Sequence, residues 1–358
     1  MARAEHQWMS IRKLVRAAGE GYAYDPGSLY DKMNTAQVLD PLPLRLLSIA
    51  GGILSAVFFT GFLFISDLLK EGLHSLITGI AFMLLSWLLP RWRNTLAFDT
   101  FAVALQAVGL VITAMGLTGL GWLGVQIAPL FAGIALLTVM VTLSKTQVFT
   151  AVIVFFASLL FWMGAAGWQD GLHLYNLLTV ASVTAIMLSE ANALATGGRS
   201  LWLYLPLRNG VIVACFTGFV LLAGGDGSPL TSPRFIWLSY LPVAGALLIL
   251  LRHVSMELLD ADRKRRRKWM IALLLLTLPT AMNPAIAASL LILLIGFYAG
   301  HRSAFVLGVL GLPLFIGMWY YDLPISLLQK SIWMMVSGAT CMLTYLFLVF
   351  TNKEDAEG

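Results

Sequence analysis

Long apolar runs, separated by short polar stretches, follow one another from residue 44 to residue 350. Most of them approach the ~20 residues that an α-helix needs to cross the hydrocarbon core of a bilayer. They lack the period-two alternation of a membrane β-barrel, so helices are the structure that satisfies the backbone in lipid. We predict twelve spans, near Leu44–Ile65, Leu73–Leu89, Ala97–Thr118, Leu123–Leu143, Val148–Gly167, Leu172–Leu188, Leu203–Ala223, Ile236–Leu251, Trp269–Thr280, Ala285–Gly300, Ala304–Tyr320 and Ser326–Phe350.

The ninth and tenth of these spans are unusually short, and Asn283-Pro284 separates them. Two interpretations remain open. The pair is either two short spans joined by an Asn-Pro turn, or a re-entrant pair of half-helices over 269–300 that leaves ten full spans. In the second case Asn283 becomes a candidate for lining a cavity.

Composition supports a membrane protein and excludes several other classes. Of 358 residues, 59% are hydrophobic and 11% are charged, with a mean hydropathy of +0.84. A soluble domain carries about 25% charged residues, so this chain has too little polar surface for a water-soluble globule. The predicted fold is therefore all-α, a polytopic transmembrane helix bundle.

The distribution of Lys and Arg predicts how the chain is oriented. If the N-terminus is cytoplasmic and the spans alternate, all but three of the 23 Lys and Arg residues fall on the cytoplasmic side; the exceptions are Lys70, Arg234 and Lys330. Both termini are then cytoplasmic. Because the basic residues are spread along one edge of the membrane, a pI near 9.2 does not indicate nucleic-acid binding. The densest run, Arg263–Lys268, is expected to orient the chain and to contact anionic lipid headgroups, or to make a more specific lipid or protein contact.

The two ends of the chain are predicted to be small cytoplasmic tails. Residues 1–42 form the first tail, residues 43–350 the transmembrane domain and residues 351–358 the second tail. The first tail contains a short amphipathic helix that suits the bilayer interface, with Trp8, Ile11, Leu14 and Val15 on one face and Arg12, Lys13 and Arg16 on the other.

Few polar side chains lie at membrane depth, and each one there needs a reason because an ionisable group in lipid is costly. Asp99, Gln106 and Thr113 are spaced by seven residues and share one face of the third span. That face is expected to point into the bundle, where it lines a polar path or hydrogen-bonds a neighbouring helix. Arg208 enters the seventh span from the cytoplasmic side; it is a further candidate for a polar path or recognition site, in a position that is also compatible with interfacial capping.

Lys330 and Asp322 stand near the outer start of the last span. Lys330 either snorkels outward and pairs with Asp322, or it binds an anionic group of a substrate. No phosphate-binding loop, dinucleotide fingerprint, zinc motif or serine-hydrolase elbow is present, and neither cysteine has metal-ligand spacing. We therefore expect no enzymatic activity and no cofactor, with an enzyme acting on lipid-linked substrates as a remote alternative.

The chain resembles the membrane-protein family of domain of unknown function 4401. The matching residues are Gln7, Trp8, Leu14, Ala17–Gly19, Leu291, Gly296–Gly300, Gly308, Tyr320–Leu323, Leu327–Ser331 and Gly338. The resemblance implies a multi-pass inner-membrane protein of Gram-negative bacteria and implies no activity. It draws attention to Tyr320, Tyr321, Lys330 and Ser331, which form either an aromatic belt with an anchoring lysine or a recognition site for an anionic headgroup or solute.

Two functions follow as hypotheses. The first is a permease or flippase-like carrier of a small or amphipathic solute, in which Asp99 and Lys330 face a common cavity. The second is a non-transporting scaffold or accessory subunit of an envelope complex, which predicts a packed interior without a cavity. Protein partners and oligomeric state are not indicated by the sequence.

Overall fold

A computed structural model describes residues 72–92, 96–190, 198–224, 236–257, 269–274 and 277–322, with scattered positions between 51 and 65 and between 328 and 346. The chain divides into two units, Met1–Gly51 and Gly52–Gly358, and every helix described below belongs to the second. The predicted tail helix, the basic run Arg263–Lys268 and the predicted C-terminal tail lie outside the described residues.

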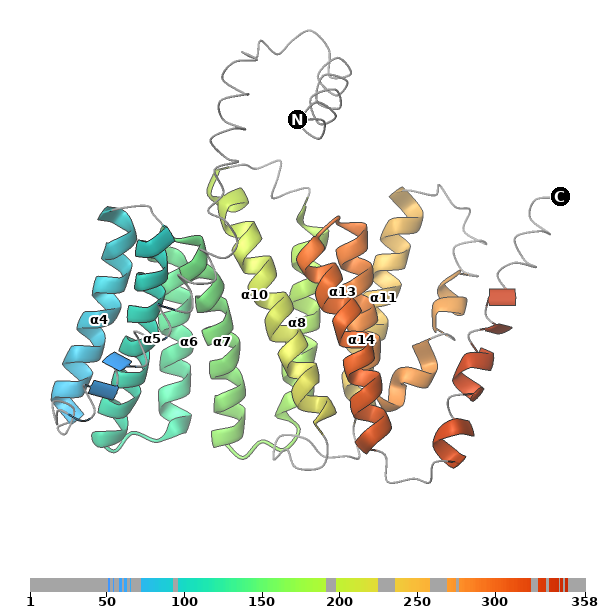
Figure 1. Cartoon of the computed structure of the whole chain (residues 1–358), viewed down its shortest axis with the longest axis horizontal. Coiled ribbons are helices and arrows are strands. Elements are labelled where there is room, and N and C mark those ends of the chain that lie inside the picture. Colours follow the sequence, from blue (N-terminus) through green and yellow to red (C-terminus); the bar gives the residue numbers. More distant parts are fainter. Residues whose placement is uncertain are drawn as a thin grey trace, which may run out of the picture. The chain divides into compact units, whose positions relative to one another are not determined.

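Every regular element in these ranges is a helix, and the helices run up and down beside one another (Figure 1). Eight of them are long and apolar enough to cross a membrane, and α13 is a shorter apolar helix of 15 residues. The prediction of an all-helical membrane protein is confirmed, while the count of about twelve spans stays a prediction. The helices are α4 (Gly72–Trp92), α5 (Leu96–Gly119), α6 (Gly124–Val141), α7 (Lys145–Ala165), α8 (Gly171–Leu188), α10 (Gly198–Ala223), α11 (Trp237–Glu257), α13 (Pro284–Tyr298) and α14 (Arg302–Asp322).

Prolines do not end these helices, although proline breaks helices in water. Five of them lie inside a helix: Pro90, Pro129, Pro206, Pro242 and Pro313. At membrane depth the helix persists because no water competes for the backbone and neighbouring groups satisfy what the ring frees. The span predicted to stop at Leu89 therefore continues to Trp92.

Glycine closes three of the connections. Gly121, Gly167 and Gly300 have positive φ of 84°, 67° and 67°, which glycine adopts without steric cost. After Gly300, the His301 amide donates to Gly296 O at 2.8 Å and the Gly300 amide donates to Phe297 O at 3.2 Å. This pair of bonds is the Schellman motif that ends a helix, and it fixes the backbone of His301 between α13 and α14.

The predicted Asn-Pro turn is present. A 3-10 helix, Leu278–Met282, leads into Asn283, and the Asn283 Oδ1 atom accepts a hydrogen bond from the Ala285 amide at 3.2 Å. Pro284 occupies the first turn of α13, where its missing N–H has no intrahelical partner to lose. Asn283 is therefore the N-cap of α13.

Glycines bring α4 and α5 into close contact. A Cβ added at Gly79 would lie 2.3 Å from Thr113 Oγ1, and one at Gly116 would lie 2.6 Å from the Leu76 amide nitrogen. Small residues drive this kind of backbone approach between membrane helices, where apolar burial gives little net attraction. The α13–α14 pair is built in the same way, since a Cβ at Gly296 would lie 2.4 Å from the Phe305 nitrogen.

A buried core joins α7, α8, α10, α11, α13 and α14. Tyr175 belongs to this core and is 1% exposed. Its ring meets Phe156 edge-on at 5.9 Å between centroids, and its hydroxyl donates to Ala214 O at 3.0 Å. The phenol thus fills space while its one polar group stays bonded.

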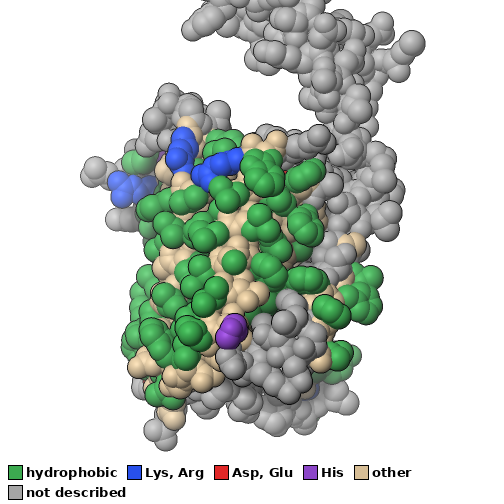
Figure 2. All heavy atoms as spheres, turned by 90° about the vertical axis from the view of Figure 1, so that its left-hand side faces the viewer, with side chains coloured by type: hydrophobic (Ala, Val, Ile, Leu, Met, Phe, Trp, Pro, Cys, Tyr) green, Lys and Arg blue, Asp and Glu red, His purple; other side chains and the backbone are tan. Residues whose placement is uncertain are grey.

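Large apolar side chains cover the outward faces of the helices. Leu84, Val111, Leu136 and Phe161 are each about half exposed. In Figure 2 hydrophobic side chains predominate among the described residues of the visible face, and the Lys and Arg side chains drawn in blue gather towards one end of it. A surface of this kind suits contact with lipid chains, with the cations at the level of the headgroups.

Candidate functional site

The polar face predicted on the third span lies inside the group formed by α4, α5, α6 and α7. Gln106 and Thr113 are buried, with 4% and 2% of their surface exposed, and Asp99 is half-buried. Helix α5 packs against α4, α6 and α7. The expectation that this face points into the bundle is therefore met, and the question becomes what its oxygens do.

Gln106 is oriented by a hydrogen-bond network around Thr138. The Thr138 hydroxyl donates to Ile134 O at 2.8 Å and accepts from the Trp87 indole N–H at 3.2 Å. Because its only proton is used, the group of Gln106 that lies 3.1 Å away must be the amide nitrogen. The Gln106 carbonyl oxygen consequently points away from Thr138.

A second network joins α4 to the start of α7. Gln147 is fully buried and donates from Nε2 to Ser86 O at 2.8 Å. Its carbonyl oxygen accepts a short bond from the Thr142 hydroxyl, which in turn accepts from the Ser144 amide at 3.1 Å. Ser144 caps α7 through the Gln147 amide. These groups are bonded and serve to hold the helices together.

Three oxygens on the α5 face remain without a partner among the described residues. They are Asp99 Oδ1, Gln106 Oε1 and Thr113 Oγ1. Seven helical residues rise by about 10 Å, so the three oxygens are spaced along one side of a membrane-spanning helix. Buried oxygens without a partner are rare in proteins and costly in lipid. Asp99 Oδ1 and Gln106 Oε1 suit water molecules or the hydrogen-bond donors of a solute, whereas Thr113 Oγ1 lies in the close contact with Gly79 of α4.

A second polar site joins the end of α8, the first half of α10 and the turn before α14. The His301 Nε2 atom lies 3.2 Å from Glu190 Oε2 and makes a short contact with an Arg208 Nη1 atom. Arg208 is 5% exposed, and its guanidinium lies 5.5 Å from the centre of the Tyr204 ring. Burial lowers the pKa of His301; the Arg208 charge lowers it further, and the Glu190 carboxylate opposes both.

A third polar group lies near the other end of α8. The His173 Nδ1 atom is 2.7 Å from the Ser239 hydroxyl of α11, which also accepts from Asn176 Nδ2 at 3.2 Å. His173 Nε2 and Asn176 Oδ1 have no partner among the described residues. These side chains tie α8 to α11 and leave one ring nitrogen and one amide oxygen suited to a buried water.

The residues highlighted at the C-terminal end make local contacts. The Lys330 ammonium donates to Tyr320 O at 2.6 Å and lies 4.9 Å from the centre of the Tyr320 ring. Tyr321 is 81% exposed and meets Tyr320 edge-on. Ser331 is exposed, and the side chain of Asp322 lies outside the described residues.

The predicted site residues thus fall into separate places. Asp99 and Gln106 share the interior of α4–α7, whereas Lys330 is bound to the end of α14, which packs against α13 and α10. Asn283 caps α13, and Arg208 joins a cluster of its own. The structure does not bring Asp99 and Lys330 to one described cavity.

Sequence reasoning missed His301 and Glu190 as partners of Arg208. The three residues are separated by up to 111 positions, and each one alone suits an ordinary interfacial position. The available signal was topological, because the predicted spans place all three at the cytoplasmic side.

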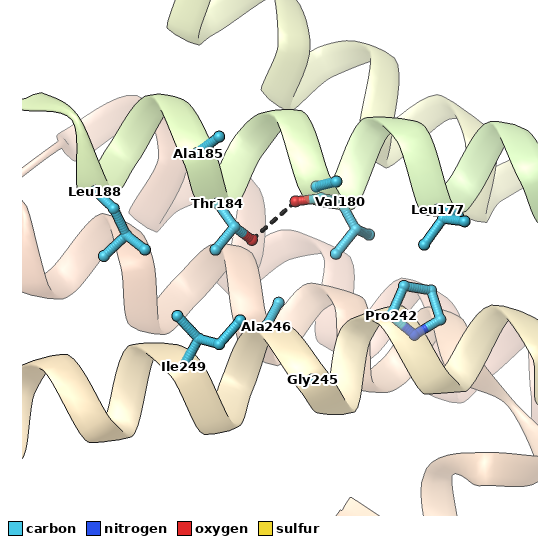
Figure 3. Close-up of a pocket in the computed structure, with 10 residues that line it drawn as sticks. Leu177, Val180, Thr184, Ala185, Leu188, Pro242, Gly245, Ala246 and Ile249 are labelled. Atoms are coloured by element: carbon cyan, nitrogen blue, oxygen red, sulfur yellow. Dashed lines mark hydrogen bonds between the residues drawn. The ribbon is translucent and has the colours of Figure 1, made fainter.

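Two hollows between helices are lined almost entirely by apolar side chains. One, of about 340 Å³, lies between α8 and α11, from Leu177 to Leu188 and from Pro242 to Ile249 (Figure 3). Thr184 projects into it, but its hydroxyl donates to Val180 O at 2.8 Å in its own helix. The other, of about 400 Å³, lies between α11, Leu273 and α13. Neither hollow presents free polar groups to a hydrophilic solute.

Within the described ranges, no three His, Cys, Asp or Glu side chains are grouped to hold a metal ion. Cys215 is a free thiol that is fully buried in the core. The expectation of no cofactor stays a prediction.

Comparison with known proteins gives one match. A family model described as a domain of unknown function (DUF4401) matches residues 41–350. Searches of curated proteins and of solved structures give no match. The matched range contains all the helices and all three polar sites described above.

Proposed function

The chain belongs to this family of integral membrane proteins with several apolar helices, and from that premise we propose that it is a permease or flippase-like carrier of a small or amphipathic solute. The proposed path follows the polar face of α5 through the interior of α4–α7. It replaces the path between Asp99 and Lys330 that the sequence suggested.

The unpartnered oxygens of α5 carry this proposal. Gln106 Oε1 is fixed by the donor pattern around Thr138, so its lack of a partner does not depend on which way the amide is drawn. In a helix that only has to pack, such an oxygen would face a donor on the next helix. Asp99 Oδ1 lies about 10 Å away along the same helix, so α5 offers two such oxygens to a hydrogen-bonding solute, whereas Thr113 Oγ1 packs against Gly79 of α4.

We further propose that the chain resides in a bacterial inner membrane with both termini in the cytoplasm. Arg91, Lys145, Arg199, Arg252 and Arg302 lie at the end of α4, the start of α7, the start of α10, the end of α11 and the start of α14. Helices that alternate in direction put these ends on the same side, which supports the orientation expected from the excess of cytoplasmic charge. In this orientation the run Arg263–Lys268 faces anionic headgroups.

Thiol accessibility tests the path without knowledge of the substrate. In a chain carrying Cys215→Ala and Cys341→Ala, single cysteines are introduced by Gln106→Cys and Thr113→Cys. A membrane-impermeant methanethiosulfonate reacts with thiolates in contact with water. It is expected to label Gln106→Cys and to leave Thr113→Cys unlabelled, because that side chain packs against Gly79 of α4. The matched control is Val111→Cys on the same helix, whose side chain is 49% exposed towards lipid and should stay unlabelled.

A further variant, Trp168→Cys in the α7–α8 connection, verifies that the protein is folded and accessible, since Trp168 is 44% exposed. If Trp168→Cys is labelled while Gln106→Cys resists the reagent from both sides of the membrane, the interior of α4–α7 is dry and the carrier proposal fails.

The alternative, a non-transporting scaffold or accessory subunit, is favoured by a different observation. The glycine contacts between α4 and α5 leave no room for a Cβ, and the two hollows described above are apolar. A dry interior in the labelling experiment, together with a protein that co-purifies in stoichiometric amount, would support this role. An enzymatic role has no support in the grouping of the described side chains, and we do not propose one.

A further inference from the structure

The cluster of Glu190, Arg208 and His301 contains a conflict between two hydrogen bonds. His301 Nε2 lies within bonding distance of both the Arg208 guanidinium and the Glu190 carboxylate. Arg208 has only donors, and an ionised carboxylate has only acceptors. An imidazole nitrogen either carries a proton or offers a lone pair, so His301 Nε2 can satisfy one of these partners at a time.

The proton on Nε2 decides which partner is bonded. Without it, the lone pair accepts from Arg208 and faces the Glu190 oxygen across 3.2 Å with no proton between them. With it, the N–H donates to Glu190 and meets an Arg208 N–H of the same polarity. The two states differ by one proton taken from water, and no covalent bond other than N–H changes.

Among the described residues, Arg208 and Glu190 are the two charged groups that act most strongly on His301. Besides Glu190, which follows the C-cap of α8, and Arg208 of α10, the elements around the turn carry Tyr204 on α10, Arg302 at the start of α14, and His253 on α11 beside Tyr298. Arg302 is exposed to solvent. The buried Arg208 cation and the Glu190 carboxylate therefore compete for the hydrogen bond with His301 Nε2.

We propose that Glu190, Arg208 and His301 form a proton-binding site in which uptake of one proton transfers the imidazole from Arg208 on α10 to Glu190 at the end of α8. The side chains involved are 15% exposed at His301 and 27% at Glu190, so the site is open enough for a proton to arrive from water. This role goes beyond the proposed carrier and does not depend on it.

The transfer has a mechanical consequence because the His301 backbone is fixed. The Schellman motif at Gly300 and the close contact of Gly296 with Phe305 make α13, the turn and α14 one packed unit. Moving the imidazole from one partner to the other therefore changes which helix this unit is bonded to. Proton uptake would exchange the bond of this unit to α10 for a bond to Glu190, which follows α8, while the packing of α13 and α14 against α10 remains.

Nuclear magnetic resonance of the full chain in detergent micelles, labelled with ¹⁵N at its histidines, tests the site. The His301 signals are assigned by their loss in His301→Gln. At pH 8 we expect the tautomer with the proton on Nδ1 and a bare Nε2, because Nε2 then accepts from Arg208. On acidification the ring should gain its second proton at a pH below that of an ordinary histidine.

Two charge-removing variants give the matched comparison. Glu190→Gln should lower the midpoint of the His301 titration, and Arg208→Gln should raise it, because each removes one of the opposing charges. A His301 ring with its proton on Nε2 at pH 8, or variants that shift the midpoint in the same direction or not at all, would overturn the proposal. If either variant fails to fold, the tautomer of the unmodified chain still decides.

Discussion

Replacing Gly116 with alanine should destabilise the protein through the contact of α5 with α4. The new Cβ would lie 2.6 Å from the Leu76 nitrogen and 2.9 Å from Gly72 O, whereas ordinary contact begins at 3.4 Å. Both neighbours are backbone atoms, which cannot rotate away as a side chain would. The two helices must therefore separate by about 0.8 Å at this point, given those distances.

The expected magnitude follows from two opposing effects. Overpacking of this kind costs about 1–3 kcal/mol, and alanine regains about 0.5–1 kcal/mol because it prefers the helix more than glycine does. The net loss should lie between about 0 and 2.5 kcal/mol of unfolding free energy, with a central value of about 1 kcal/mol. Gly133→Ala in α6 is the matched control, since its Cβ meets nothing within 4 Å and only the favourable helix effect remains.

Unfolding by increasing fractions of sodium dodecyl sulfate, followed by circular dichroism in mixed micelles, measures both variants against the native chain. Gly116→Ala should unfold at a lower fraction of the denaturing detergent than the native protein, and Gly133→Ala at the same or a higher one. If Gly116→Ala is as stable as Gly133→Ala, the close approach of α4 and α5 is not present in the folded protein.

Two other outcomes are expected. Gln147→Leu leaves Ser86 O and the Thr142 hydroxyl without their hydrogen-bond partner. Because hydrogen bonds between membrane helices contribute about 0.6 and at most 1.7 kcal/mol each, the variant should lower the free energy of unfolding by about 1–3 kcal/mol. The same unfolding assay measures this change, and no loss would mean that this network does not hold α4 to α7. The thermal stability of the native chain should fall between pH 7.5 and 5 more than that of His301→Gln, because the lowered pKa of His301 means that the unfolded chain binds more protons in this range; equal pH slopes would contradict the burial of the ring.

The hydrophobic pattern was sufficient to locate the helices, because in lipid every spanning backbone must bond to itself. It could not set the helix ends at prolines, where the pattern alone ended a span at Leu89 and the helix continues to Trp92. It could not give the pairing of helices either. A helix that is apolar on all sides does not show which face meets a partner, and the contacts of α4 with α5 depend on single glycines such as Gly79 and Gly116.

The candidate sites divide in the same way. The seven-residue spacing of Asp99, Gln106 and Thr113 was readable because one helix carries all three residues. The meeting of Glu190, Arg208 and His301 was not readable, because it depends on three elements packing together. The sequence leaves Lys330 either to pair with Asp322 or to share a path with Asp99; in the structure its ammonium donates to Tyr320 O in the last turn of α14.

Two arginines, Arg91 and Arg199, also hydrogen-bond to the backbone at the end of α6. The Arg91 guanidinium donates to Val141 O at 3.1 Å, and Arg199 donates to Met140 O, so residues from α4 and α10 bond to the last carbonyls of a helix that lies between them in sequence. Topology mapping by charge reversal would be ambiguous at these positions. Exchanging either arginine for glutamate removes a charge that directs insertion and also removes a hydrogen bond from the end of α6. A change in the measured topology could then result either from the altered charge or from misfolding of α6. Arg252, for which the described contacts show no such bond to α6, is the better position at which to separate the two effects.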